Sequence, residues 1–319
     1  MSPPSFPPPQ GAAWDELRDA APLQVWLDVA VEIAARHGLP AGAPSLFPSG
    51  SDVVVRVGDA VVKLSEPRWR AEIAAEADLL ARVVGHLPLA TPEVLATGDH
   101  HGWPYVVMSF VPGRALGEVW PRLDHAARLQ LAVEIGHLLD ALGRLPVPEA
   151  QAEAWPPFLS RMATQATARL SGRKVPISPE WSGRIAPFLE ANPVSERALA
   201  WMHTELLGEH LLVSEAGGQV HLSAMLDFAD GRVGHPYYEI PAVVEFLFQG
   251  EPGLLRALLL AWGHAEDALT PALSRELCAW GLIHQFGSLS RALAAAGAPE
   301  PEDLDALAER LYGLAPDAS

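Results

Sequence analysis

The sequence contains only one cysteine, Cys278, and it has no uninterrupted apolar run near the roughly 18 residues that a membrane-spanning helix needs. A single cysteine excludes a disulfide within the chain and is typical of a reducing compartment. The first ten residues have neither the basic start nor the apolar stretch of a secretory signal, and five of them are prolines. We therefore expect a cytoplasmic protein without a membrane span, with a disordered proline-rich tail over residues 1–11.

Positive charge is also scarce. The 319 residues include 22 Lys and Arg against 39 Asp and Glu, so the formal net charge is −17. Such a surface repels nucleic acid and anionic membranes and attracts cationic small molecules. We therefore expect a small-molecule partner, no nucleic acid and no membrane. The length allows one large domain or two modest ones, and the oligomeric state stays open.

The pattern near the N-terminus is helical. Residues 12–44 predict a helical segment that is interrupted near Pro22 and ends before Gly38 and Pro40. One face of it is apolar, so we expect this segment to pack on the body of the protein; the face consists of Trp26, Val29 and Ile33.

Residues 45–112 have the alternation of a small antiparallel sheet. One hairpin is predicted over residues 53–64 around the turn Gly58-Asp59, and a second has strands at 93–97 and 105–111 around a turn at 98–102. Between the hairpins we predict one main helix from Pro67 to Gly85. Its predicted buried stripe consists of Trp69, Ile73, Ala77, Leu80 and Val84.

Residues 113–319 are mostly helical. Asp124 has the position of an N-cap for a helix to about Leu142, and further helices are predicted over 254–263, 271–296 and 303–311. These patterns predict an α+β protein with a small sheet lobe and a larger helical lobe. We expect a ligand cleft at their boundary near residue 112.

The residues with the clearest chemistry lie in two short segments. Trp201–Val213 contains a polar loop between apolar runs, and the segment Met225-Leu-Asp-Phe-Ala-Asp230 ends a third apolar run at Asp227. The loop holds His203, Glu205, Glu209 and His210. An acid that orients an acceptor hydroxyl, followed by oxygen ligands for Mg²⁺, is what phosphoryl transfer from a nucleotide requires.

The order and spacing of these segments resemble the catalytic and metal-binding loops of the aminoglycoside phosphotransferase family, a branch of the protein-kinase-like fold. The resemblance extends from about Leu46 to Gly263. It implies a bilobal fold with a nucleotide-binding N-lobe over 45–112 and a C-lobe over 113–319 that carries the catalytic loop, the metal loop and the acceptor site. It also implies transfer of the γ-phosphoryl group of ATP or GTP, with Mg²⁺, to a small-molecule hydroxyl. A cationic polyhydroxylated acceptor such as an aminoglycoside suits the acidic chain.

The same resemblance assigns the nucleotide-binding residues. Lys63 in the strand 60–64 matches the lysine that touches the α and β phosphates, and it needs an acidic partner. Glu76 fits that partner best, while Glu72 lies one helical turn away on the same side and stays an alternative. Ser51, in the loop 48–52, is expected at the phosphates through backbone N–H groups. The backbone of Ser109 and Val111 is expected at the adenine edge.

Glu205 is expected at the acceptor hydroxyl, where the family normally has aspartate. The additional methylene moves the carboxylate by roughly an ångström unless the loop compensates, and a misplacement of about 1 Å can cost on the order of a hundredfold in rate. Because phosphoryl transfer depends mainly on positioning and charge, the longer side chain need not abolish it. Asp227 matches the metal ligand of an Asp-Phe-Gly motif, with Ala229 in place of the glycine.

His210 stands where the family usually has asparagine, a magnesium ligand. Imidazole is a poorer ligand for this hard cation, so three outcomes stay open: His210 binds a softer ion such as Mn²⁺, it only forms hydrogen bonds, or a metal site is lost. Glu209 is an alternative source of an oxygen ligand. We expect His203 to organise the loop through backbone hydrogen bonds and Glu239 to brace the loop. Other histidines, among them His284, have no evident partner in the sequence.

A second interpretation is a catalytically silent, kinase-like nucleotide-binding or regulatory protein, which the residues Glu205, His210 and Ala229 favour. A histidine-based metal hydrolase is a third, but the sequence lacks the paired-histidine spacing of such enzymes. Metal-dependent nucleotide binding with turnover separates the enzyme from the silent protein.

Overall fold

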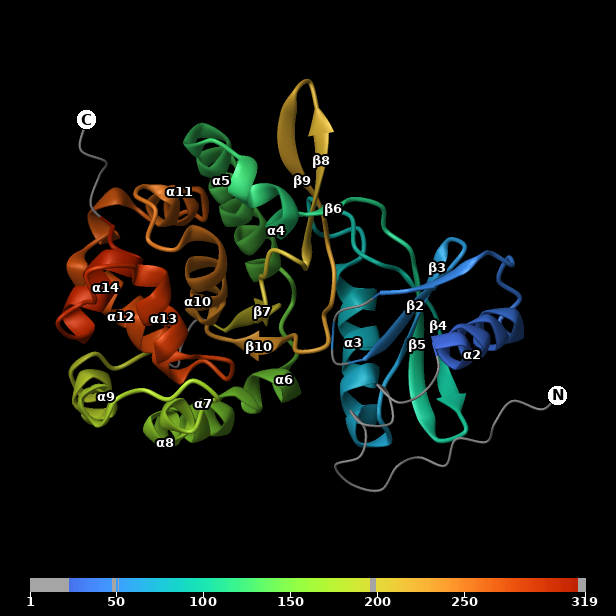
Figure 1. Ribbon diagram of the computed structural model, residues 1–319, viewed down its shortest axis with the longest axis horizontal. Helices are drawn as coiled ribbons and strands as arrows, with labels where there is room; N and C mark the ends of the chain where they lie inside the picture. The colour runs from blue at the N-terminus through green and yellow to red at the C-terminus, as the bar shows by residue number, and fades with distance from the viewer. Residues whose placement is uncertain (1–22, 48–49, 51, 196–198, 315–319) are drawn as a thin grey trace. The chain divides into compact units, whose positions relative to one another are not determined.

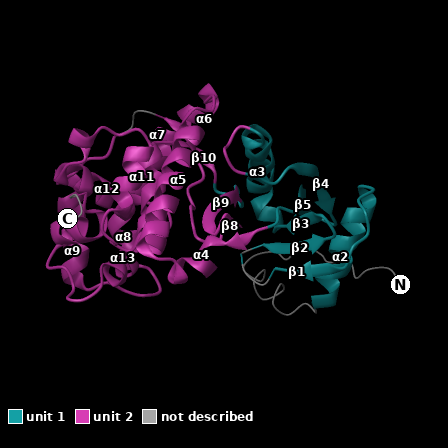
Figure 2. Cartoon of the chain, turned by 90° about the horizontal axis from the view of Figure 1, so that it is seen from above, with its two compact units in different colours: residues 1–85, 90–112, 226–230 teal, residues 86–89, 113–225, 231–319 magenta. Residues whose placement is uncertain are grey.

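The computed structural model describes residues 23–47, 50, 52–195 and 199–314 (Figure 1). The predicted tail at 1–11, the start of the helical segment 12–44 and the candidate residue Ser51 lie outside the described residues. The chain divides into two compact units (Figure 2). The first, which we call the sheet unit, has residues 1–85, 90–112 and 226–230; the second, the helical unit, has residues 86–89, 113–225 and 231–319.

The sheet unit contains one antiparallel sheet of five strands in the order β1-β2-β3-β5-β4. Its strands are β1 (Pro44–Leu46), β2 (Val53–Val57), β3 (Ala60–Leu64), β4 (Val94–His100) and β5 (Trp103–Ser109). The first hairpin has the predicted bounds. The second is longer than predicted because its turn needs only His101 and Gly102, whose φ angles of 53° and 96° fit a tight two-residue turn.

Two helices pack on the sheet from opposite sides (Figure 1). Helix α2 (Leu23–Arg36) buries Trp26, Val29 and Ile33 against one face of the sheet, as the apolar pattern predicts. Because side chains alternate along a strand, Lys63 points to the other face while its neighbours Val62 and Leu64 pack toward α2.

Helix α3 (Arg70–Val83) follows a short 3₁₀ turn at Pro67–Trp69 and contacts β4 and β5. The predicted stripe is partly wrong, because Trp69 is 43% exposed. The residues of α3 that are buried are Ile73, Glu76, Leu79, Leu80 and Val83. The helix therefore presents a face that includes an acid, which a search for apolar side chains alone does not detect.

The helical unit carries two small sheets among its helices. One has three strands in the order β6-β8-β9, and the other pairs β7 with β10. The strands are β6 (Arg114–Ala115), β7 (Ala200–Met202), β8 (Leu211–Ala216), β9 (Gln219–Met225) and β10 (Arg232–Gly234). The polar loop of residues 203–210 connects β7 to β8, so a strand holds each of its ends.

The helices of this unit include the predicted helix that Asp124 caps, since the Asp124 side chain accepts a hydrogen bond from the backbone N–H of Ala127. They are α4 (Leu116–Val119), α5 (His125–Gly143), α6 (Glu149–Glu153), α7 (Trp155–Thr164), α8 (Ala166–Ser171), α9 (Pro179–Ala191), α10 (Ile240–Val243), α11 (Leu254–Ala261), α12 (Pro271–Ile283), α13 (Leu289–Ala296) and α14 (Leu304–Tyr312). A 3₁₀ turn at Pro236–Glu239 precedes α10, and a π-helical turn at Val244–Phe248 follows it.

The single helix predicted over 271–296 is wrong, because the chain forms α12 and α13 with a break at residues 284–288. Gly287 folds back so closely that a Cβ atom there would lie 2.4 Å from the carbonyl oxygen of Gly281. Ser288 then starts a new helix by accepting the backbone N–H of Arg291. None of the described helices has the length and apolar character needed to span a membrane.

Candidate active site

Lys63 lies at the centre of an acidic cluster in the sheet unit. Its Nζ atom is 2.9 Å from Oδ1 of Asp227 and 3.0 Å from Oε2 of Glu76. A third carboxylate, Asp52, is 3.6 Å away and accepts a hydrogen bond from the Ser65 hydroxyl. Three carboxylates thus share one ammonium group: one directly precedes β2, one lies on α3, and one comes from a distant segment of the chain.

The structure places Glu76, and not Glu72, against Lys63. Glu76 is 1% exposed, whereas Glu72 is exposed to solvent. Burial alone would lower the pKa of Lys63, but the carboxylates of Glu76, Asp227 and Asp52 outweigh it, and the pKa of Lys63 lies above its usual value. Burial raises the pKa of Glu76 while Lys63 pulls it down. At 3.0 Å the Lys63 ammonium and the Glu76 carboxylate form a charge-assisted hydrogen bond.

Asp227 has the backbone geometry of a specialised position. Its φ angle is 62°, in the left-handed region that few non-glycine residues adopt, and Phe228 beside it is 1% exposed. The buried ring anchors the turn while the Asp227 side chain stays 39% accessible. Such strain is found mainly at ligand-binding positions. An accessible carboxylate oxygen is also the type of ligand that Mg²⁺ prefers.

The other nucleotide-site candidates are only partly described. Ser51 is outside the described residues, and its neighbour Gly50 has a φ angle of 115°. Ser109 ends β5, and its backbone N–H donates to the carbonyl of Glu93, so this N–H is not available to an adenine edge. Val111 follows two residues later and is half-buried.

In the helical unit, Glu239 braces the loop 203–210 as predicted. Its carboxylate accepts the backbone N–H groups of His203 and Thr204, the latter at 2.9 Å. Glu239 is 1% exposed, and burial raises its pKa to about 8 against the opposite effect of the two N–H donors. The carboxyl group therefore fixes two consecutive peptide groups directly before Glu205.

The histidines of the loop form backbone hydrogen bonds. The N–H of Glu205 donates to Nδ1 of His203 at 3.3 Å, which confirms the expected organising role of His203. Nδ1 of His210 lies 2.9 Å from the carbonyl oxygen of Glu205. Because a carbonyl can only accept, Nδ1 of His210 carries the proton and its lone pair is on Nε2. Glu209 is exposed.

His284, which has no evident partner in the sequence, is part of this arrangement. Its Nε2 lies 3.2 Å from the carbonyl oxygen of Thr204, and its Nδ1 accepts the N–H of Phe286. Nε2 therefore donates, and burial lowers the pKa of His284 to about 3, so the ring is neutral. Arg169 holds His284 in turn by donating to the carbonyl oxygens of residues 282–285 at the end of α12.

Thr204 is thus held from both sides. Its N–H donates to Glu239 and its carbonyl accepts from His284, while its φ angle of 70° is strained for a β-branched residue. A strained residue persists only where its surroundings over-determine it. These contacts therefore fix the conformation of the backbone directly before Glu205. No local sequence signal identifies Thr204 or His284, because their contact joins residues 80 positions apart.

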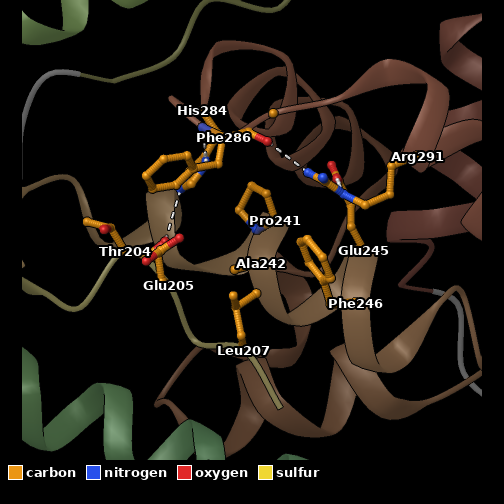
Figure 3. Close-up of a pocket in the computed structure, with 11 residues that line it drawn as sticks. Thr204, Glu205, Leu207, Pro241, Ala242, Glu245, Phe246, His284, Phe286 and Arg291 are labelled. Carbon is orange, nitrogen blue, oxygen red and sulfur yellow. Dashed lines mark hydrogen bonds and ion pairs between the residues drawn. The ribbon is translucent and has the colours of Figure 1, made fainter. Parts of the chain in front are cut away.

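A pocket in the helical unit opens beside Glu205 (Figure 3). It has about 310 Å³ of space, part of it open to solvent. Thr204 and Glu205 border one side, and Glu245, Phe246 and Arg291 border the opposite side (Figure 3). Within the part of the chain that the structure describes, no set of three or more Asp, Glu, His or Cys side chains converges as a metal site.

Comparison with known proteins shows the family. A family model described as the phosphotransferase enzyme family matches residues 45–275. Viomycin phosphotransferase of Streptomyces vinaceus is 28% identical over 228 residues, which are 67% of this chain and 76% of the relative. The GDP complex of aminoglycoside 2'-phosphotransferase-IIIa is similar with a TM-score of 0.67 and 18% identity, over 88% of this chain and 94% of that chain. The streptomycin–ATP ternary complex of APH(2")-IIa has a TM-score of 0.58 and 13% identity, over 81% and 91% of the two chains.

The fold is that of the protein-kinase-like small-molecule phosphotransferases, with a small antiparallel sheet and a larger, mostly helical part. The chain belongs to the phosphotransferase enzyme family. The predicted fold class and the predicted family are therefore confirmed, and so is the expectation of a nucleotide-dependent phosphotransferase.

Proposed function

We propose that this protein transfers the γ-phosphoryl group of ATP or GTP to a hydroxyl group of a small molecule. The observation that carries the proposal is the position of Lys63 between Glu76 and Asp227. In this proposal residues 45–112 bind the nucleotide, and residues 113–319 supply the catalytic loop and the acceptor site. The silent-protein alternative gains no support from this cluster, whose charged members are all present.

Lys63 is proposed to contact the nucleotide phosphates, with Glu76 fixing its direction. Ser51 in the loop 48–52 is proposed to add backbone N–H groups, and the carbonyl of Ser109 and the N–H of Val111 are proposed at the base. An ammonium group held by a buried carboxylate loses little freedom when a phosphate binds it, which favours affinity. One solved relative is a GDP complex and another contains ATP, so both nucleotides belong in the test.

Asp227 is proposed as the ligand of Mg²⁺, since it is an accessible oxygen donor next to Lys63. When bound, the ion would neutralise charge on the phosphates. His210 is proposed as a second ligand through Nε2, the nitrogen with the lone pair. Because a nitrogen ligand suits a softer ion better than Mg²⁺, Mn²⁺ is the natural comparison.

Glu205 is proposed to orient the acceptor hydroxyl and to accept its proton. The acceptor class that the net charge of −17 favours is a cationic polyhydroxylated compound such as an aminoglycoside. Streptomycin in one solved relative and viomycin in the name of another are compatible with this class. The cytoplasmic location is kept as part of the proposal, with the buried free thiol of Cys278 in support.

The test combines binding with turnover. Thermal unfolding is measured with ATP and with GTP, each with Mg²⁺, with Mn²⁺ and without metal, and ADP or GDP release is then followed over a panel of hydroxyl compounds. We expect metal-dependent stabilisation, and turnover that falls on the order of a thousandfold in Asp227→Asn. The matched control is Asp267→Asn, which changes an exposed acid. Nucleotide binding without turnover across the panel favours the silent protein, and the absence of nucleotide binding contradicts both interpretations.

A further inference from the structure

Two arginines of the helical unit bind the carbonyl groups at the break between α12 and α13. Arg169, on α8, donates through its two terminal nitrogens to the carbonyl oxygens of residues 282–285, at distances from 2.6 to 3.4 Å. Arg173, just after α8, donates to the carbonyl oxygens of Gln285 at 2.8 Å and Gly287 at 3.1 Å. The last carbonyl groups of an α-helix have no partner within the helix, so Arg169 supplies partners where α12 ends.

The segment that these arginines bind carries His284. The carbonyl oxygen of His284 accepts from Arg169 at 2.6 Å, and its Nε2 lies 3.2 Å from the carbonyl oxygen of Thr204 (Figure 3). Tyr238 holds the same segment: its hydroxyl accepts the N–H of Gln285 at 2.6 Å, and its ring centroid lies 4.2 Å from that of the His284 ring. The backbone is therefore held through carbonyl and N–H groups, and the imidazole is directed at Thr204.

These contacts form a closed ring with the brace of the catalytic loop. Tyr238 and Glu239 are consecutive residues of the 3₁₀ turn Pro236–Glu239. Contacts run from Glu239 to Thr204, from Thr204 to His284, and from His284 back to Tyr238. All four residues are buried. Because buried hydrogen bonds in a network support one another, displacing one member disturbs the others.

Arg169 joins this ring to α8, and arginine is the residue type suited to that contact. A guanidinium presents its N–H groups in a rigid planar fork, so one side chain reaches four carbonyl oxygens, whereas a lysine ammonium is a point donor. The charge of Arg169 also lies at the C-terminus of α12, where the helix dipole favours a cation. The contact joins residues more than 110 positions apart, so the local sequence contains no sign of it.

We propose that Arg169 is a positioning residue for the phosphoryl transfer: by fixing the carbonyl groups of residues 282–285 it directs His284 to Thr204, and so holds Glu205 in place for the acceptor hydroxyl. The inference rests on the proposed function, because Glu205 orients a hydroxyl only if one is phosphorylated. The effect of Arg169 on the reaction passes through His284. The position of α8 thereby becomes a determinant of the rate.

Amide hydrogen exchange of the full-length protein tests the contact without any substrate. In Arg169→Gln, exchange in the loop 203–210 should accelerate at least about tenfold, although the hydrogen bonds of Arg169 go to residues 282–285. Adding Arg169→Gln to His284→Ala should accelerate exchange less than about twofold further, because the connection is already broken. The matched control is Arg184→Gln. Arg184 is a half-buried arginine of α9 that donates to the distant carbonyl of Glu302, outside the ring, so its loss should leave the loop unchanged.

Steady-state kinetics test the catalytic consequence. The kcat of Arg169→Gln should fall about tenfold to a hundredfold, because a small displacement of Glu205 is costly. The KM for the nucleotide should stay unchanged, since Lys63 and Asp227 belong to the sheet unit. In the His284→Ala background the same substitution should change kcat less than about twofold. Arg169→Lys retains a cationic donor, so its kcat should lie between the two, and it repeats the test if the glutamine variant does not fold.

Three results would overturn the inference: unchanged loop exchange in Arg169→Gln, equal losses of kcat with and without His284, or an equal effect of Arg184→Gln. A failure of the proposed function is seen separately. It would remove turnover from the unchanged protein as well, and this inference would fall with it.

Discussion

The sheet unit and the helical unit hold their candidate residues in position by different forces. In the sheet unit, Lys63 is fixed by ion pairs to Glu76 and Asp227, all between ionisable side chains. In the helical unit, the backbone before Glu205 is fixed by hydrogen bonds from Thr204 to Glu239 and from His284 to Thr204. The first arrangement positions a charge, and the second positions a peptide. Substitutions should therefore affect them in different ways.

The largest effect is expected in Lys63→Met, which removes the centre of the ion-pair cluster. Glu76 would remain buried without its partner, which should lower the free energy of unfolding by about 3–5 kcal/mol. Turnover should fall on the order of a hundredfold to a thousandfold because the phosphate contact is lost. Chemical denaturation and steady-state kinetics measure both. Lys174→Met is a natural control, since Lys174 is exposed and is the only other lysine of the chain; equal effects in the two variants would contradict the cluster's role.

Glu205→Asp tests whether the loop is built for the longer carboxylate. We expect kcat to fall on the order of a hundredfold, because the carboxylate would retreat by about 1 Å from the acceptor hydroxyl. Shortening Glu239 as well, in Glu205→Asp/Glu239→Asp, should move the loop in the compensating direction. The kcat of the double variant should therefore be about tenfold higher than that of Glu205→Asp. Full activity in the single variant would mean that the loop is not adapted to glutamate.

The backbone brace is tested at His284. His284→Ala leaves the buried carbonyl of Thr204 without this donor, which should cost about 1–3 kcal/mol of stability. Because the loop also positions Glu205, kcat should decrease while the KM for the nucleotide stays unchanged. His284→Gln can place an amide N–H near the same carbonyl and should recover most of kcat, whereas the exposed His137→Ala should change nothing. Loss of kcat that the glutamine variant does not rescue at all would leave His284 with a packing role only.

A pH dependence of stability is also expected from Glu239. Its pKa in the folded protein is raised to about 8 from an ordinary value of 4.5, so the folded state binds this proton more tightly than the unfolded state. The contribution of Glu239 to stability is therefore complete below about pH 4.5 and is lost as the pH rises toward 8. One such group changes the free energy of unfolding by at most about 1.4 kcal/mol per pH unit. In Glu239→Gln, the free energy of unfolding from denaturation curves should decrease less steeply between pH 5 and 8 than in the unchanged protein. The same pH dependence in both proteins would argue against a raised pKa of Glu239.

Much of the sheet unit could be predicted from the sequence because its signals are local. The alternating strands around Gly58-Asp59 define the first hairpin and with it the face of Lys63. The resemblance favoured Glu76 over Glu72, but periodicity alone could not decide between them, since both lie on one side of the helix and only the packing of α3 on the sheet buries one of them.

The helical unit was less predictable because its site depends on contacts between distant segments. Glu239 could be inferred from its position in the motif, but His284 lies 80 residues from Thr204 and its role follows from the end of α12. The break after α12 depends on the close approach of Gly287 to Gly281, which leaves no pattern in the apolar periodicity. The contact of Asp52 was likewise not predicted, because only the folded chain brings this residue to 3.6 Å from the Lys63 ammonium group.

The charges around Lys63 have a consequence for the order in which ligands arrive. Three carboxylates surround one ammonium, which leaves an excess of about two negative charges next to the place proposed for a polyanionic tail. An uncomplexed triphosphate would be repelled there, whereas a divalent cation brings the balance back to neutral. The protein should therefore recognise the metal–nucleotide complex as a single ligand, and Lys63 is then free to exchange its bond with Asp227 for one with a phosphate oxygen.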